Sequence, residues 1–165
     1  MVNQLFSPHS IRREKFSIST DFEKLDAHIV HDYLCNRSYW AKGVPFDQVL
    51  RSMQYSFCFG VYAEEGNEDK QIGFARVMSD FTTFAYLADV FILESYRGQG
   101  LGKWLVEYIL SYPELQNLRR WTLNTHDAHS LYTRFGFKQI PNPETSLIFR
   151  PSQNKHLNIS DKIHG

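Results

Sequence analysis

The stretch YRGQGLGK at residues 96–103 contains three glycines at alternate positions, between an arginine and a lysine. The apolar run YLADVFIL (86–93) precedes it, and apolar residues at helical spacing follow it as far as Tyr112. At a turn from a buried strand into a helix, unpaired backbone N–H groups and the positive end of the helix dipole attract anions. Glycines let such a backbone approach a phosphate without interference from Cβ atoms. The stretch therefore predicts a strand, an anion-binding turn and a helix in succession.

Two familiar nucleotide-binding motifs do not fit these glycines. A Walker A loop, G-x-x-x-x-G-K-[ST], would require Gly at position 97 and Ser or Thr at position 104, which are Arg97 and Trp104. A dinucleotide fingerprint requires G-x-G-x-x-G, whereas the spacing here is G-x-G-x-G. The remaining alternative to a phosphate site is a tight turn whose glycines only relieve unfavourable dihedral angles.

Composition narrows the class of protein. The 165 residues suffice for one domain, and 42% hydrophobic residues predict a packed interior. Lys+Arg and Asp+Glu both number 18, so the chain is neutral and unsuited to binding nucleic acid by phosphate neutralisation. Cys35 and Cys58 do not form a disulfide framework, which favours a reducing compartment. No apolar run approaches the roughly 18 residues that span a membrane, and no signal peptide is evident, so we expect a cytoplasmic protein.

Periodicity predicts the order of helices and strands. Thr20 and Glu23 suggest a capping box for the first of about four helices. The helices are expected at 22–34, 46–53, 101–112 and 128–135, and the strands at 14–20, 56–63, 71–78, 86–93, 119–125, 137–140 and 146–150. The fold class is therefore α+β (a mixed α/β arrangement): a single domain with a twisted, mostly antiparallel sheet of about seven strands. The ordered core should span about 14–150, and the polar tail 151–165 is expected to fray.

Two motifs resemble the GNAT N-acetyltransferase superfamily. Arg97, Gly100 and Gly102 give the R-x-x-G-x-G of its motif A, and AHSLYTRFGF (128–137) resembles its A-x-x-L-Y-x-x-x-G-F segment. The resemblance extends over roughly residues 14–150 in the element order of the family. It implies acetyl-CoA as the co-substrate, with no metal, and transfer of its acetyl group to an amine.

The resemblance also implies which residues hold the donor. The loop amides would bind the pyrophosphate, with added charge from an arginine and a lysine, and the preceding strand would pair with pantetheine at Val90 and Ile92. The residues of the loop are Arg97, Gly98, Gln99, Gly100, Leu101, Gly102 and Lys103. Thr125 stands where the family commonly has an asparagine, so its cofactor contact is expected either to be weakened or to be made through the hydroxyl.

Two residues are candidates for proton transfer. Tyr132 matches the tyrosine that the family places near the sulfur, where a phenol with a pKa near 10 suits a donor to the departing thiolate. Its alternative is a core aromatic. Asp89 is an acid within an apolar strand, where a carboxylate is unusual unless it is paired or functional.

The strand around Asp89 also resembles the diamine acetyltransferase branch, whose strand carries L-E-D, although Ala88 replaces the first acid. Asp89 could bind the acceptor ammonium, act as a base through water, or pair structurally with an arginine such as Arg76. The Ala88 substitution argues against a polyamine acceptor and against direct base catalysis.

Aromatic residues between the first two helices suggest the acceptor site. Tyr33, Tyr39 and Trp40, with Phe46, lie in the region that forms one wall of the acceptor cleft in the family, and aromatic faces suit a cationic or apolar acceptor. Ordinary core packing is the alternative. The THDAH segment (125–129) is interpreted as a helix cap with surface histidines, because no third ligand for a metal can be named.

Two classes of function remain open. The leading hypothesis is an acetyl-CoA-dependent N-acetyltransferase acting on a small-molecule or amino-acid-like amine. The alternatives are an acyl-CoA-binding protein with a regulatory or interaction role, and an enzyme that acetylates a protein at a lysine side chain or at the N-terminus. A homodimer is expected only by analogy with the family.

Overall fold

The computed structural model describes residues 1–150, and the predicted frayed tail, 151–165, lies outside the described residues. Within the chain, residues 1–129 form one compact unit, and the segment that begins at Ser130 forms a second. The first unit contains the entire sheet and helices α1 to α3. No helix within residues 1–150 has the length and apolar character needed to cross a membrane.

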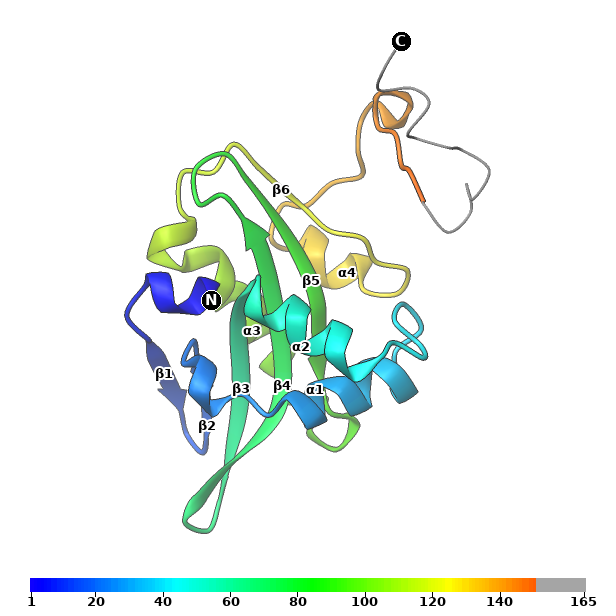
Figure 1. The fold of residues 1–165 in the computed structure, drawn as a ribbon. Helices are drawn as coiled ribbons and strands as arrows, with labels where there is room; N and C mark the ends of the chain where they lie inside the picture. The colour runs from blue at the N-terminus through cyan, green and yellow to red at the C-terminus, as the bar shows by residue number, and fades with distance from the viewer. Residues whose placement is uncertain (151–165) are drawn as a thin grey trace. The chain divides into compact units, whose positions relative to one another are not determined.

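A six-stranded sheet dominates the first unit (Figure 1). Its strands are β1 (Ser10–Arg13), β2 (Phe16–Ser19), β3 (Phe57–Glu65), β4 (Glu68–Ser79), β5 (Phe84–Ile92) and β6 (Arg120–Thr122). They lie in sequence order, and every neighbouring pair is antiparallel except β5 and β6, which are parallel. The mixed, mostly antiparallel α+β class is therefore confirmed, with one strand fewer than predicted.

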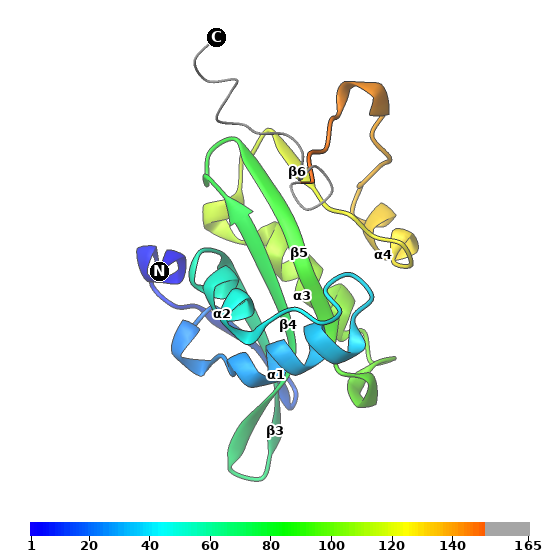
Figure 2. The ribbon, with the colours of Figure 1, turned by 45° about the vertical axis from the view of Figure 1, so that its right-hand side comes forward.

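Helices cover both faces of this sheet. Helices α1 (Ala27–Asp32) and α2 (Phe46–Gln54) lie on one face, and α3 (Leu101–Ser111) lies on the other (Figures 1 and 2). α4 (His129–Thr133) lies at the start of the second unit, with only its first residue in the first. The short helical turns are Val2–Leu5, Phe22–Lys24, Glu94–Tyr96, Pro113–Leu115 and Pro143–Thr145, and a π-helical turn at Tyr33–Arg37 extends α1.

The first predicted helix is wrong at its beginning. Instead of one helix from residue 22, a 3-10 turn covers Phe22–Lys24 and α1 starts at Ala27. The Asp26 carboxylate accepts hydrogen bonds from the backbone N–H groups of His28 (2.8 Å) and Ile29 (3.3 Å), so Asp26 is the N-cap. The backbone N–H of Asp26 in turn donates to Oε1 of the buried Gln71 at 2.7 Å. A long-range contact with β4 thus determines where the helix begins.

Strand β1 was not predicted; it pairs with β2, which corresponds to the strand expected at 14–20. Most of the other elements of the first unit follow the predicted periodicity. The second helix is confirmed as α2, directly after Pro45, and the predicted hairpin is confirmed as β3 and β4. α3 ends at Ser111, as its apolar stripe and Pro113 indicate. β6 is shorter than the predicted strand at 119–125.

In the second unit, helix α4 is closed by Gly136 as predicted. Gly136 has a φ of 89°, and its N–H donates to the Thr133 carbonyl at 3.1 Å. The strands predicted at 137–140 and 146–150 are wrong, because neither segment pairs with a strand among residues 1–150. Pro141 and Pro143 directly follow the first segment, and Leu147 in the second is 98% exposed.

Candidate functional site

Strands β5 and β6 pair over only three residues each. Phe84, Ala85 and Tyr86 of β5 face Arg120, Trp121 and Thr122 of β6. β5 continues to Ile92, so no strand pairs with its β6-facing edge from Leu87 onward in the part of the chain that the structure describes. An open strand edge is able to form hydrogen bonds with an extended ligand.

The pairing with β4 determines how the end of β5 is oriented. Phe91 pairs with Phe74, and the Leu93 N–H donates to the Ile72 carbonyl at 2.8 Å. Because backbone groups alternate in direction along a strand, those of Ile92 point away from β4, toward the open edge. The Nε of Arg97 donates to the Ile92 carbonyl at 3.0 Å, in agreement with this direction.

A β-bulge lies in the same stretch of β5. Ala88 pairs with Arg76 and Phe91 with Phe74, so three steps along β5 match two along β4. Asp89 lies within this extra length and has a φ of 51°. That left-handed conformation favours glycine, and aspartate is among the few other residues that adopt it readily. The bulge turns the side chain of Asp89 and re-orients the backbone beside it.

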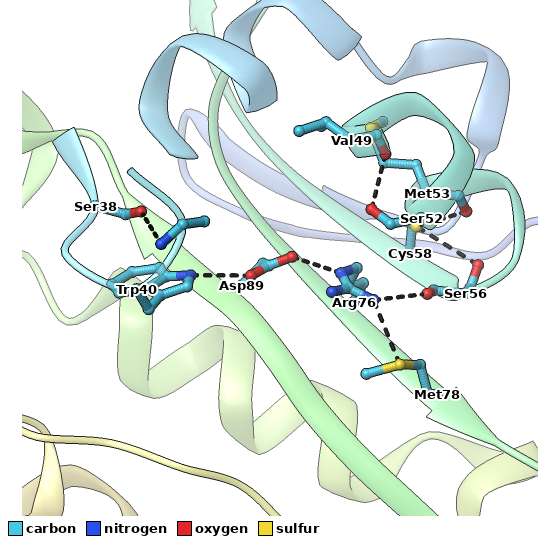
Figure 3. Close-up of polar contacts among 11 residues, drawn as sticks. Ser38, Trp40, Val49, Ser52, Met53, Ser56, Cys58, Arg76, Met78 and Asp89 are labelled. Carbon is cyan, nitrogen blue, oxygen red and sulfur yellow. Dashed lines mark hydrogen bonds and ion pairs between the residues drawn. The ribbon is translucent and has the colours of Figure 1, made fainter. Parts of the chain in front are cut away.

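Both carboxylate oxygens of Asp89 accept hydrogen bonds (Figure 3). Arg76 donates through Nε to Oδ2 at 2.5 Å, and Trp40 donates through Nε1 to Oδ1 at 2.9 Å. The Asp89 side chain is only 9% exposed and that of Arg76 17%. On the other side of its guanidinium, Arg76 donates to Oγ of Ser56 at 3.2 Å. The ion pair that was one of three roles considered for Asp89 is therefore present.

Residues 38–41, the aromatic segment, connect β5 with the chain after β6. Trp40 contacts Asp89, while the Tyr39 hydroxyl accepts the N–H of His126 at 3.0 Å and lies 3.4 Å from the Asp127 carboxylate, to which it donates. The Tyr39 ring packs edge-on against both Trp40 and His126. Even so, Tyr39 is 50% and Trp40 43% exposed, so their rings present an accessible aromatic surface.

Tyr33 has a different environment from the other aromatic candidates. Its ring stacks on Phe91 with centroids 3.8 Å apart, and its hydroxyl accepts a hydrogen bond from Arg97 at 2.7 Å. Burial raises the pKa of this phenol, and the adjacent guanidinium of Arg97 partly opposes that rise. Tyr33 is thus a buried support for β5 and Arg97, whereas Tyr39 and Trp40 are exposed.

The glycine loop ends at the N-terminus of α3. Gly98 and Gly100 have φ values of 78° and 76°, and a Cβ added at either would meet no atom within 4 Å. Within residues 1–150, none of the six backbone N–H groups from Gly98 to Lys103 donates to a carbonyl or a side chain. Unpaired N–H donors at the N-terminus of a helix are an arrangement that can bind an anion.

Comparison with known proteins identifies the family. The family model described as "Acetyltransferase (GNAT) domain" matches residues 56–139, which are 84 of the 165 residues. The chain belongs to the GNAT acetyltransferase family. The match includes β3 to β6, the bulge, the glycine loop and α4.

Individual proteins that are similar to this chain agree with this assignment. A crystal structure of a GNAT-family protein from Xanthomonas campestris is 39% identical, covers 86% of this chain and 93% of its own, and superposes with a TM-score of 0.77. A protein of Gibberella zeae assigned as an acetyltransferase is 28% identical over 157 residues, covering 84% of this chain and 87% of its own. A protein from Clostridium acetobutylicum, crystallised with acetyl-CoA, is 15% identical over 91% of this chain and 99% of its own, with a TM-score of 0.61, and shares the fold.

The structure brings most of the predicted site residues into one region of the first unit. Val90 and Ile92 lie at the open edge of β5, the glycine loop follows it, and Trp40 contacts Asp89 directly. Thr125 uses its hydroxyl locally, accepting the N–H of Ala128 at 3.0 Å. Tyr132 belongs to the second unit, where its ring packs edge-on against Phe137.

Sequence reasoning missed several contacts of this site. Ser56 was not a candidate, yet it anchors Arg76. His126 and Asp127 were interpreted as part of a surface cap, whereas both contact Tyr39. No spacing rule links these residues with their partners, since the contacts join segments far apart in the chain. Residues 1–150 contain no group of three or more His, Cys, Asp or Glu side chains that could hold a metal ion.

Proposed function

We propose that this GNAT protein transfers the acetyl group of acetyl-CoA to the primary amine of a small molecule, by direct attack within a ternary complex. The observation that carries the proposal is the run of unpaired amides from Gly98 to Lys103, which begins six residues beyond Ile92 at the open edge of β5. The amides suit a pyrophosphate and the strand edge suits the amide groups of pantetheine. Acetyl-CoA contains both chemical features in one molecule.

The residues at the loop fit the phosphates of this donor. Left-handed Gly98 and Gly100 leave the approach to the amides free of side chains, and the exposed Lys103 adds a positive charge beside them. Arg97 contributes indirectly, because its guanidinium donates to the Ile92 carbonyl and to Tyr33. The acetyl-CoA complex of the Clostridium acetobutylicum protein supports the same choice of donor.

The proposed chemistry uses the strand bulge and a tyrosine. The amine, after losing a proton to water, attacks the thioester carbon, and a backbone N–H of the bulge stabilises the charge that develops on the carbonyl oxygen. The C–S bond then breaks as the amide forms, and Tyr132 is the proposed acid that protonates the departing thiolate. The remaining excess proton on the attacking nitrogen then restores the Tyr132 phenol. The products are an acetamide, CoA with a free thiol, and one proton released to solvent.

The aromatic segment supports a small acceptor. Tyr39 and Trp40 present half-exposed rings beside the bulge, and their polar groups attach the segment to β5 and to residues 126–127. Such rings suit an alkylammonium or an apolar amine. The free thiols of Cys35 and Cys58 are compatible with a reducing compartment, and we place the activity in the cytoplasm.

The test is a turnover assay that follows release of free thiol from acetyl-CoA. The amine panel contains ethanolamine, lysine, tyramine, tryptamine and putrescine, the last because β5 resembles the diamine acetyltransferase branch. Turnover of one of these amines, above hydrolysis without amine, is the expected result. Turnover only with lysine-containing or free N-terminal peptides would favour a protein acceptor. Binding of acetyl-CoA without turnover of any amine or peptide would favour a regulatory role.

A further inference from the structure

Asp89 combines two unusual features of this chain. Four non-glycine residues within 1–150 have a positive φ, and three of them, Glu14, Phe81 and Asn117, lie in turns. Asp89 is the fourth and lies inside a strand, next to the residues proposed to contact the donor. A left-handed conformation costs free energy for a residue with a Cβ, less for aspartate than for most residues, and inside a strand it needs support from the surroundings.

The surroundings of Asp89 supply this enforcement through its side chain. Arg76 lies on β4 opposite Ala88 and reaches the Asp89 carboxylate at 2.5 Å, so the ion pair spans the bulge. Ser56 anchors the guanidinium from the other side, and Trp40 holds the second carboxylate oxygen (Figure 3). The pair is largely buried, and removing one partner would leave the other charge uncompensated.

We propose that Arg76 and Asp89 are positioning residues for acetyl transfer, which hold the backbone of Asp89 and Val90 in the bulged conformation that faces the thioester carbonyl. Trp40 belongs to the aromatic segment and donates to the same carboxylate, so Asp89 holds both the aromatic segment and the bulge. The inference rests on the proposed function. In this role Asp89 maintains the geometry of the bulge, and water accepts the proton of the acceptor amine.

The engagement of both oxygens argues for this role over that of a base. A general base needs a lone pair directed at the proton it accepts. Here Oδ2 faces Arg76 and Oδ1 faces Trp40, and the guanidinium compensates the negative charge. The carboxylate is therefore better placed to hold a conformation than to remove a proton.

Two variants without a carboxylate separate the two roles. Glycine at position 89 adopts the left-handed conformation without a steric penalty, whereas alanine adopts it only at a cost of about 1–2 kcal/mol. If Asp89 positions the bulge, kcat with acetyl-CoA and the most reactive amine of the panel should be roughly 5- to 30-fold higher for Asp89→Gly than for Asp89→Ala. The acidic limb of the pH dependence of kcat/KM should also stay where it is in wild type. Equal losses in both variants, together with disappearance of that limb, would overturn the proposal in favour of a base.

The role of Arg76 is tested on the Asp89→Gly background, because removing the guanidinium there leaves no unpaired carboxylate. Arg76→Met should lower kcat by itself, but Arg76→Met combined with Asp89→Gly should be no slower than Asp89→Gly alone. Strictly multiplicative losses would contradict a shared role. Thermal unfolding of each variant shows whether a lost rate reflects an unfolded protein.

A measurement without turnover keeps this inference distinct from the proposed function. The chain has three tryptophans, so the indole N–H of Trp40 gives one of three resolvable signals in a ¹⁵N-labelled sample. Arg76→Met should shift both this signal and the backbone amide signal of Val90, even if no amine is acetylated. If neither signal moves, the ion pair does not position the bulge, whatever the enzyme does.

Discussion

The glycine loop and the β5 bulge reach the same kind of backbone conformation by different means. In the loop, Gly98 and Gly100 take φ values near 77° with no neighbour within 4 Å of a Cβ position. In the bulge, Asp89 has a φ of 51°, and Arg76 and Trp40 both donate hydrogen bonds to its carboxylate. The loop conformation is therefore local and belongs to its own residues, whereas the bulge depends on two other segments of the chain. A substitution in the loop should affect donor binding alone, and one near the bulge should affect stability and rate together.

The largest effect is expected from a substitution in the glycine loop. Gly100→Glu should abolish measurable binding of acetyl-CoA, because a carboxylate would occupy the approach to the amides and repel the phosphates. Calorimetric titration measures the loss. Gly66→Glu is the matched control: Gly66, in the turn between β3 and β4, has a φ of 68° and also no neighbour within 4 Å. Unchanged affinity in Gly100→Glu would mean that the loop binds something else.

The acid proposed for the transfer lies in neither region. Tyr132→Phe should lower kcat by roughly 10- to 1000-fold, the usual range for losing an acid or base, with donor affinity kept. Steady-state kinetics with the most reactive amine, alongside a titration with acetyl-CoA, measures both quantities. Tyr55→Phe serves as the control, since Tyr55 is 70% exposed and lies outside the site. Wild-type turnover in Tyr132→Phe would remove this phenol from the mechanism.

Behind the bulge, β4 approaches β5 too closely for an added side chain. A Cβ at Gly73 would lie 2.6 Å from Cδ1 of Ile92 and 2.8 Å from the carbonyl oxygen of Phe91. Because the carbonyl belongs to a paired strand, Gly73→Ala should lower the free energy of unfolding by about 1–3 kcal/mol. Denaturant unfolding tests this, with Gly102→Ala as control, where the nearest atom is 3.9 Å away. Equal stability of the two variants would show that β5 shifts to accommodate the added methyl group at little cost in free energy.

The smallest effect is expected at Asp80. Unlike Asp89, this acid has its hydrogen-bond partners within the next four residues of the chain. The Thr83 hydroxyl donates to its carboxylate, as do the backbone N–H groups of Thr83, Thr82 and Phe84, and these hydrogen bonds hold the pKa of Asp80 far below the ordinary range. A depressed pKa contributes stability above the unfolded-state value, near 3.9, that is lost as the pH falls through the folded-state value. Asp80→Asn should therefore lower Tm modestly at pH 7, and the difference from wild type should shrink below about pH 4. A constant difference at all pH values would contradict this role.

Local patterns in the sequence predicted the loop side of the site and most of the fold. Apolar periodicity identified α2, α3, the β3–β4 hairpin and β5, because each is amphipathic or apolar along its own length. A turn with glycines at unfavourable dihedral angles was the alternative interpretation of the loop, and two of its three glycines, Gly98 and Gly100, are left-handed. These features depend on residues a few positions apart, which a sequence displays directly.

The bulge side depends on register, which no local pattern contains. A one-residue slip between β4 and β5 would separate Arg76 from Asp89, so neither the left-handed Asp89 nor its partner Trp40 was predictable. The start of the first helix was predicted wrongly for the same reason, because Gln71 on β4 accepts the backbone N–H of the N-cap residue Asp26. The strands expected at 137–140 and 146–150 failed because apolar alternation alone does not supply a pairing partner.

The most direct test of the account is a calorimetric titration of the purified protein with acetyl-CoA, with ATP and NAD as controls. We predict saturable binding of acetyl-CoA at one site per chain and no comparable binding of either nucleotide. Absence of acetyl-CoA binding by the folded wild-type protein would contradict it, and would leave a GNAT fold whose glycine loop is only a turn.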